Sequence, residues 1–303
     1  MNNPIAISVI IPQRNALKTI PRLFNSIPVR DNIEIIVVDN SPIPISKDDI
    51  GVDRDYQLLW SNPERYAGGA RNVGIENAVG KWLLFADADD YFTADAFDFF
   101  LSKVNSDADI IYTCMGGIYD DTGELSDRGD VYTNLVTGFC DGIVDEMELR
   151  LKFSSPCCKM VRRDFVFSHS LKYDEVVAAN DKYFSLTSGF LAKDIEAVPV
   201  VTYIATVSSG SLTRTKSKEI IKSRFLVRLR CNQFLRNHGF PDYQRSMLSA
   251  FYEARHFGFK TFVEFLKMAI KFRQSPFVGW KRWRRSLSNI KAFDKSNEKY
   301  IVR

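Results

Sequence analysis

The sequence predicts an α/β protein with a mostly parallel central sheet, helices on both faces of that sheet, and a helical C-terminal region. Strand-like and helix-like stretches alternate over residues 1–115, several of the strand-like stretches are apolar throughout, and the pattern is helical from Lys218 onward. Alternation of this kind favours a parallel sheet, and wholly apolar strands indicate burial on both faces. With 303 residues, of which 45% are hydrophobic, the chain can build a sizeable core.

The expected elements follow one another in a regular order. Strands are expected at 5–11, 33–38, 56–60, 82–86, 110–114 and 195–206, and helices at 17–27, 68–78 and 94–104. Pro21 fits only the first turn of its helix, because a proline further in would remove a backbone hydrogen bond. Residues 116–130 are rich in turn formers and predict a hairpin or a loop, whereas residues 145–190 mix helical and extended patterns.

The stretch Leu83–Phe92, "LLFADADDYF", places three aspartates within four positions directly after an apolar run. Aspartate is common in turns and at the first position of helices, so a turn or a helix cap is one interpretation. Three carboxylates this close repel one another, however, and would attract a hard divalent cation such as Mg²⁺ or Mn²⁺.

Other polar residues also follow predicted strands. Arg14 and Asn15 follow the first strand, Asp39 follows the second, and Asp87–Asp90 follow the fourth. Ligands of parallel sheets bind beyond the carboxyl ends of the strands, and these residues would all gather at that edge. A turn interpretation alone does not predict this convergence, so the metal interpretation is favoured.

The cysteines and the N-terminus bear on the cellular compartment. The five cysteines are odd in number, none has metal-site spacing, and Cys157 and Cys158 are adjacent. We interpret them as reduced thiols of a cytoplasmic protein. The N-terminus has no charged segment followed by a cleavage site, so no signal peptide is expected, and no apolar run reaches the length of a membrane span.

Four stretches, in order, resemble the family 2 glycosyltransferases, which have the GT-A fold. They are "ISVIIPQRN", "IEIIVVDNS", "GGARNVGIENAVGKWLLFADADDYF", and "KMVRRDFV" followed by "YDEVVAANDKYFSL". The resemblance covers about residues 5–215. It implies a catalytic domain at 1–215, with a nucleotide-binding half at 1–115 and an acceptor-binding half at 116–215, followed by a basic helical region at 216–303.

The resemblance also implies roles for residues at the sheet edge. Asp87 would contact the ribose or the metal, Asp89 would bind Mn²⁺ or Mg²⁺, and Asp39 would accept a hydrogen bond from uracil. The remaining residues that the resemblance places at the nucleotide are Pro12, Asn15, Arg71 and Asn72. The alternatives are a strand-end turn for Asp39, Pro12 and Asn15, and a surface salt bridge for Arg71.

Asp181 would be the general base that takes a proton from the acceptor hydroxyl, in a single displacement that inverts the sugar. A helix-cap aspartate is the alternative interpretation of the same residue. Two positions depart from the family pattern: Gln13-Arg14 stand where Val-Tyr is usual, and Asn180 stands where Glu is usual before Asp181.

The C-terminal tail carries the basic surplus of the chain. Residues 260–303 hold twelve Lys or Arg and three acids, a charge of +9, so residues 1–259 carry −5 of the net +4. The segment Phe262–Phe293 interleaves aromatic and basic residues, which suits peripheral contact with an anionic membrane on its inner face. A helix packed on the catalytic domain and, less favoured, nucleic-acid binding are the alternatives. A homodimer through this region is a further expectation.

The sequence therefore predicts a metal-dependent, inverting glycosyltransferase that uses a nucleotide-diphosphate sugar, with a UDP-sugar as the expected donor and a glycan or lipid-linked acceptor. Two other functions are left open. One is a non-catalytic protein that binds nucleotide sugars or acts as a scaffold. The other is a nucleotidyltransferase, which would require a Gly-rich phosphate loop that "PQRNALK" does not provide.

Overall fold

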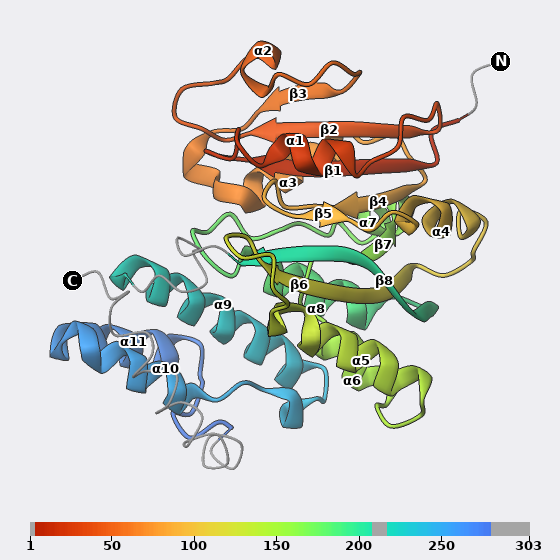
Figure 1. Cartoon of the computed structure of the whole chain (residues 1–303). Helices are drawn as coiled ribbons and strands as arrows, with labels where there is room; N and C mark the ends of the chain where they lie inside the picture. The colour runs from red at the N-terminus through yellow and green to blue at the C-terminus, as the bar shows by residue number, and fades with distance from the viewer. Residues whose placement is uncertain (1–3, 208–216, 280–303) are drawn as a thin grey trace. The chain divides into compact units, whose positions relative to one another are not determined.

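The computed structural model describes residues 4–207 and 217–279 (Figure 1). The chain divides into two compact units. The first comprises Met1–Glu175 and Phe184–Ser208, and the second comprises Val176–Tyr183 and Ser209–Arg303. This division assigns residues 176–183 to the same unit as the C-terminal region, whereas the sequence analysis placed one boundary after residue 215. The boundaries of functional domains stay a prediction.

The first unit is built on an eight-stranded sheet with strand order β3-β2-β1-β4-β7-β6-β8-β5. Its strands are β1 Ile7–Gln13, β2 Ile33–Asp39, β3 Gln57–Trp60, β4 Trp82–Phe85, β5 Tyr91–Phe92, β6 Ile110–Tyr119, β7 Lys159–Arg162 and β8 Ile195–Val207. Strands β1 to β4 pair in parallel with one another, as do β6 and β8. The predicted α/β architecture with a mostly parallel sheet is confirmed, and helices lie on both sides of the sheet (Figure 1).

The helices of the first unit connect these strands. They are α1 Ile20–Asn25, α2 Lys47–Ile50, α3 Tyr66–Asn77, α4 Ala96–Ser102, α5 Asp130–Cys140, α6 Glu146–Lys152 and α7 Arg163–Ser168. Helix α8, Asn180–Leu191, contains the boundary between the two units. Helix α1 connects β1 to β2, and α3 connects β3 to β4, so the two connections run in opposite directions across the sheet. Right-handed crossovers therefore place these two helices on opposite faces.

The structure differs from the sequence predictions where local signals were weak. Strand β7 is antiparallel and lies between β4 and β6, and the two-residue β5 is antiparallel to β8. Neither was predicted, because each is too short to show a period. Helix α1 begins at Ile20 rather than at residue 17, which keeps Pro21 in the first turn. Strand β6 continues to Tyr119, and the segment that follows returns through a single bridge between Ile118 and Leu125.

Burial on both faces of the sheet explains why the sequences of the central strands are almost wholly apolar. Every residue of β1 and β4 is buried, and the same core includes the fully buried side chains of Trp82, Phe85 and Phe100. All five cysteines are free thiols, as predicted, and four of them are buried. Within residues 4–207 and 217–279, no helix combines the length and the apolar character needed to cross a bilayer.

The second unit has a hydrophobic core of its own. Its helices are α9 Lys218–Asn237, α10 Met247–Ala254 and α11 Phe259–Lys271. Phe225 of α9 stacks on Phe265 of α11 with ring centroids 4.2 Å apart, and Phe251 of α10 meets Phe225 edge to face at 5.6 Å. The helical pattern predicted after residue 218 is therefore confirmed within the described residues.

Candidate active site

The aspartates follow β4 as a tight loop at the carboxyl edge of the sheet. Because β1, β2 and β4 are parallel, the residues after each of them lie along the same edge. The Asp90 backbone N–H donates to the Asp87 carbonyl oxygen at 3.0 Å, which closes the turn. Asp87 is half-buried, Asp89 is exposed and Asp90 is buried. Two of the three carboxylates are therefore accessible to a ligand.

Arg71 of α3 is an electrostatic partner of the aspartate loop. Its Nη2 lies 2.5 Å from Asp87 Oδ1, and the arginine side chain is almost fully buried. Its guanidinium also lies over the ring of Tyr173, 5.4 Å from the centroid. The predicted helix after the Gly pair thus brings Arg71 to the loop, where it supplies positive charge beside a carboxylate.

Asp89 lies in a charged environment, with one other carboxylate and two arginines acting on it. Asp89 reaches solvent, but surrounding protein atoms partly desolvate its carboxylate, which raises its pKa, and the charge of Asp87 raises it further. The positive charges of Arg128 and Arg22 lower the pKa of Asp89. A divalent cation between Asp87 and Asp89 would relieve the repulsion that raises this pKa.

A metal at this loop would need ligands from the substrate. The described residues contain no group of three or more His, Cys, Asp or Glu side chains suited to holding a metal by themselves. Mg²⁺ is commonly bound by one or two carboxylates together with substrate phosphates and water. Two hard carboxylates, one of which is also paired with Arg71, fit that kind of site.

Asp90 does not cap a helix, which was one interpretation of its position. Its Oδ2 accepts a hydrogen bond from the Tyr203 hydroxyl at 2.9 Å, and its Oδ1 accepts one from the Thr206 backbone N–H at 2.7 Å. Burial raises the pKa of this carboxyl well above its usual range, and the charges of Asp89 and Asp87 add to the effect. Asp95, not Asp90, stands at the start of α4.

Asp39 is held rigidly at the end of β2. It pairs with Gln13 of β1 in the sheet register. Its Oδ1 accepts from the Ser41 N–H at 3.1 Å and from Gln13 Nε2 at 3.4 Å, and its Oδ2 accepts from the Ile45 N–H at 3.1 Å. These bonds fix the direction of a buried carboxylate at the edge where nucleotide binding is predicted.

The two residues predicted to shape the pocket around the base lie nearby on β1 and the turn after it. Pro12 is a buried residue of β1, opposite Val38 of β2. Asn15 is exposed and has a φ of 57°, in the left-handed region that asparagine tolerates better than most residues. Both occupy the predicted edge, and their contact with a nucleotide stays a prediction.

Asn72 serves a buried hydrogen-bond network. Its Nδ2 donates to the Tyr173 carbonyl oxygen at 3.0 Å, and its Oδ1 accepts from the Tyr173 N–H at 2.8 Å. Its Nδ2 also lies 3.3 Å from Glu175 Oε1, and the Glu175 carboxylate binds Arg65 through two hydrogen bonds of 2.6 and 2.9 Å. The carboxamide therefore holds the Tyr173 backbone beneath Arg71, while nucleotide binding by Asn72 stays a prediction.

Asp181 belongs to the second unit. It is the second residue of α8, its side chain is 22% exposed, and Lys182 Nζ lies 3.8 Å from its Oδ2. Ala179, directly before the helix, has a φ of 62°, a costly backbone conformation for a residue with a Cβ. Strained residues of this kind cluster at functional sites.

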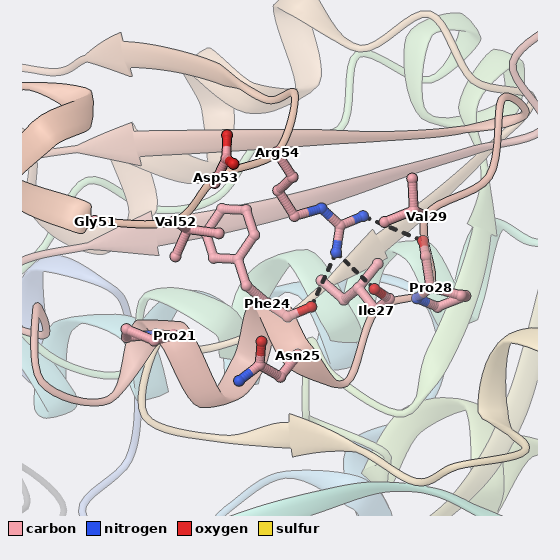
Figure 2. Close-up of a pocket in the computed structure, with 10 residues that line it drawn as sticks. All are labelled: Pro21, Phe24, Asn25, Ile27, Pro28, Val29, Gly51, Val52, Asp53 and Arg54. Carbon is pink, nitrogen blue, oxygen red and sulfur yellow. Dashed lines mark hydrogen bonds between the residues drawn. The ribbon is translucent and has the colours of Figure 1, made fainter.

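A separate hollow of about 570 Å³ lies beside α1 (Figure 2). It is lined by residues of α1, of the turn at 27–29 and of the segment 51–54, and Arg54 donates there to the carbonyl oxygens of Phe24, Ile27 and Pro28. These bonds satisfy carbonyl groups in the last turn of α1 and in the segment that follows it. None of the predicted site residues lines this hollow.

Sequence reasoning missed three residues that bind the aspartate loop. Tyr203 and Thr206 come from β8, and Arg22 comes from α1. Arg22 Nη2 donates to the Asp89 carbonyl oxygen at 2.5 Å, and Arg22 Nη1 pairs with Asp120 at 2.6 Å. The one signal in the sequence was the presence of polar residues in the otherwise apolar end of a predicted strand, "TYIATV".

Comparison with known proteins places this arrangement in a family. Residues 8–167, just over half of the chain, match the family described as glycosyl transferase family 2. The putative glycosyltransferase EpsH of Bacillus subtilis is 25% identical over 228 residues, 72% of this chain and 65% of EpsH. The succinoglycan biosynthesis protein ExoO of Rhizobium meliloti is 23% identical over 83% of this chain and 75% of its own length.

Solved structures show the same fold. Residues 1–349 of S. aureus TarS, in complex with UDP, align with a TM-score of 0.58 at 17% identity, over 98% of this chain and 91% of that one. The mannosyltransferase PcManGT of Pyrobaculum calidifontis, in complex with GDP-Man and Mn²⁺, aligns with a TM-score of 0.54 at 14% identity, over 98% and 85%. The sheet edge with its aspartate loop is therefore part of a glycosyltransferase fold, and the chain belongs to glycosyl transferase family 2.

Proposed function

We propose that this protein transfers a sugar from a nucleotide-diphosphate donor, with a UDP-sugar as the expected donor, to a hydroxyl of a glycan or lipid-linked acceptor. The observation that carries the proposal is the pair Asp87 and Asp89 at the carboxyl end of β4, with Arg71 against Asp87. The family match and the UDP complex of TarS support a donor of this class. ExoO and TarS, whose names refer to succinoglycan and poly(ribitol-phosphate), support a polymeric acceptor that carries hydroxyl groups.

Asp87 and Asp89 would hold Mn²⁺ or Mg²⁺ together with the two phosphates of the donor. When bound, the metal supplies Lewis-acid stabilisation of the leaving diphosphate. Arg71 adds a fixed positive charge beside Asp87, close to where the diphosphate would lie. The Mn²⁺ in the complex of PcManGT supports the proposal that Asp87 and Asp89 hold a metal.

Asp39 would accept the N3–H of uracil, with Pro12 and Asn15 shaping the pocket around the base. The bonds from Ser41 and Ile45 support this role, because they orient the carboxylate before the ligand arrives. Asn72 would act with these residues by holding Tyr173 beneath Arg71.

Asp181 would act as the general base. Its carboxylate would accept the proton of the acceptor hydroxyl while that oxygen forms a bond to the anomeric carbon and the diphosphate leaves, so the configuration inverts. The support for this role is the resemblance of "YDEVVAANDKYFSL" to the family segment that carries the base, and the position of Asp181 in the first turn of α8.

Release of the nucleoside diphosphate tests the proposal without a known acceptor. We expect one UDP-sugar in a panel to be hydrolysed slowly in the presence of Mn²⁺, and we expect excess EDTA to abolish the release of UDP. GDP- and dTDP-sugars form the second panel, since GDP-Man is the ligand named with PcManGT. Turnover that persists in EDTA would contradict the metal dependence. Nucleotide binding without turnover of any donor or acceptor mixture would favour the non-catalytic interpretation.

The described part of the C-terminal region supports contact with an anionic membrane. Helix α11 buries Thr261, Phe265 and Ala269 in its own unit but exposes a second apolar row, in which Phe259 is 80%, Leu266 36% and Ile270 66% exposed. The exposed lysines 260, 267 and 271 flank this row. An apolar row flanked by lysines suits a helix lying at the surface of an anionic bilayer. The predicted tail residues 280–293 lie outside the described residues.

Replacement of Lys271 by glutamate is expected to weaken binding to vesicles that contain phosphatidylglycerol by about 5–30-fold, because each basic residue near an anionic surface contributes about 1 kcal/mol and the new negative charge is repelled. Co-sedimentation at low salt measures this effect. Lys193→Glu, which makes the same charge change at an exposed lysine of the first unit, is the matched control and should bind as wild type. Equal losses in both variants, or binding to neutral vesicles alone, would contradict the proposal.

By the same proposal, the protein would act in the cytoplasm, at the inner face of the membrane. A homodimer through the C-terminal region stays a prediction, and the molar mass in solution, measured by light scattering, tests it.

A further inference from the structure

The aspartate loop is fastened at both ends by neighbouring strands. It leaves β4 after Phe85 and enters β5 at Tyr91, and β5 pairs with β8 through Tyr91–Ile204 and Phe92–Tyr203. The residues that would bind the metal therefore span the gap between two strands of the same sheet. Their geometry depends on β8, which lies more than one hundred residues further along the chain.

The Tyr203 hydroxyl connects two parts of this loop. It accepts a hydrogen bond from the Asp87 backbone N–H at 2.9 Å and donates one to Asp90 Oδ2 at 2.9 Å. Tyr203 is fully buried and Asp90 is 4% exposed. The Tyr203 hydroxyl thus fixes both the main chain at Asp87 and the carboxylate of Asp90.

Thr206 supplies a second connection from the same strand. Its backbone N–H donates to Asp90 Oδ1 at 2.7 Å, and its Oγ1 donates to the Asp89 carbonyl oxygen at 2.8 Å. Both oxygens of Asp90 are therefore engaged by β8. A buried carboxylate bound in this way faces the protein interior, so Asp90 serves the loop as an anchor and leaves metal binding to Asp87 and Asp89.

Such anchors matter because the affinity of a metal site depends on how firmly its ligands are oriented. Groups that hydrogen-bond and orient metal ligands typically contribute about 10–100-fold to metal affinity. We propose that Tyr203, together with Asp90 and Thr206, positions the Asp87–Asp89 loop for binding of the metal and the diphosphate. This inference rests on the proposed function of the loop, and it makes Tyr203 a positioning residue rather than a catalytic one.

The test is Mn²⁺ binding in the presence of saturating UDP, measured by electron paramagnetic resonance, which does not require turnover. Tyr203→Phe keeps the ring, which packs against Phe92 at 5.2 Å, and removes only the hydroxyl. We expect the Kd for Mn²⁺ to rise by about 10–100-fold. We expect kcat at saturating Mn²⁺ to fall by less than about tenfold, because the ligands themselves remain.

Tyr112→Phe is the matched control. Tyr112 is a buried tyrosine of the neighbouring strand β6, and its ring packs against Phe153 at 4.9 Å. This variant should leave the Kd for Mn²⁺ unchanged, and its Tm measures the effect of removing a buried tyrosine hydroxyl that lies outside the aspartate loop. Thr206→Val is the second variant, in case Tyr203→Phe does not fold. It removes only the bond to the Asp89 carbonyl oxygen and should raise the Kd several-fold.

The outcomes separate this inference from the proposed function. If wild type binds Mn²⁺ with UDP and both Tyr203→Phe and Thr206→Val bind it equally well, the positioning role is wrong while the metal site stands. An equal rise in Kd for Tyr112→Phe would also overturn it, because the effect would then be one of general stability. If wild type binds no Mn²⁺ with any nucleoside diphosphate, the metal site and the positioning role both fail.

Discussion

Asp89→Asn is expected to lower kcat/KM for the sugar-nucleotide donor by about 10²–10³-fold, equivalent to a few kcal/mol of lost transition-state stabilisation. The substitution keeps the size of the side chain but removes the charge that would bind the metal. It should also raise the Mn²⁺ concentration needed for half-maximal activity. Asp89 is exposed, and its side chain has no place in the core, so the Tm should change little.

Asp95→Asn is the matched control for this substitution. It removes the same charge six residues further along the chain, at an exposed position before α4 where the aspartate side chain makes no capping hydrogen bond. Its activity and its metal requirement should equal those of wild type. Full activity in Asp89→Asn, with unchanged sensitivity to EDTA, would disprove the assignment of the metal ligand.

Asp181→Asn is expected to reduce kcat for transfer to the acceptor by about 10²–10⁴-fold, the range that a positioned general base contributes. The KM for the donor and the Mn²⁺ requirement should stay within about twofold of wild type, because the amide removes only the capacity to accept the proton of the acceptor hydroxyl. Initial-rate kinetics with varied donor and Mn²⁺ separate these quantities. Loss of donor affinity with an unchanged kcat would show that Asp181 acts in binding instead.

Glu219→Gln provides the comparison for Asp181→Asn. Both acids stand in the first turn of a helix, Asp181 in α8 and Glu219 in α9, so each substitution removes a similar favourable interaction with the helix dipole. Similar small changes in Tm are expected for the two variants, with the loss of kcat confined to Asp181→Asn. Equal losses of kcat would indicate that helix stability, not proton transfer, explains the effect.

The sheet was predictable because burial leaves a local signature. Strands β1 and β4 are buried along their whole length, so their apolar runs indicate central strands. Asp39 is the last residue of the neighbouring strand β2, and Asp87 comes two residues after the end of β4. The same logic failed for β7, where Lys159 and Arg162 flank only two apolar residues in a four-residue strand. Hydrogen bonds to a neighbouring strand, and not composition, create that element.

The residues that hydrogen-bond to the aspartate loop and hold it in place were harder to predict than the aspartates themselves. Asp87, Asp89 and Arg71 lie within one short stretch of sequence, and a motif can identify them. Tyr203 and Thr206 meet Asp90 across 113 and 116 residues of chain, and no periodicity encodes such pairings. Asn72 shows the reverse problem, since its place beside Arg71 suggested nucleotide binding while its carboxamide is bonded to the backbone of Tyr173.

The position of β8 has a consequence for how the protein acquires its function during synthesis. Strands β1 to β4 and the aspartates leave the ribosome early, and these strands can pair as soon as they have emerged. Tyr203 and Thr206 follow only after more than one hundred further residues, and closing so long a segment is slow compared with local pairing. A nascent chain therefore carries its acidic residues for some time without the strand that arranges them, and it gains competence to bind a cation only after β8 has emerged and paired.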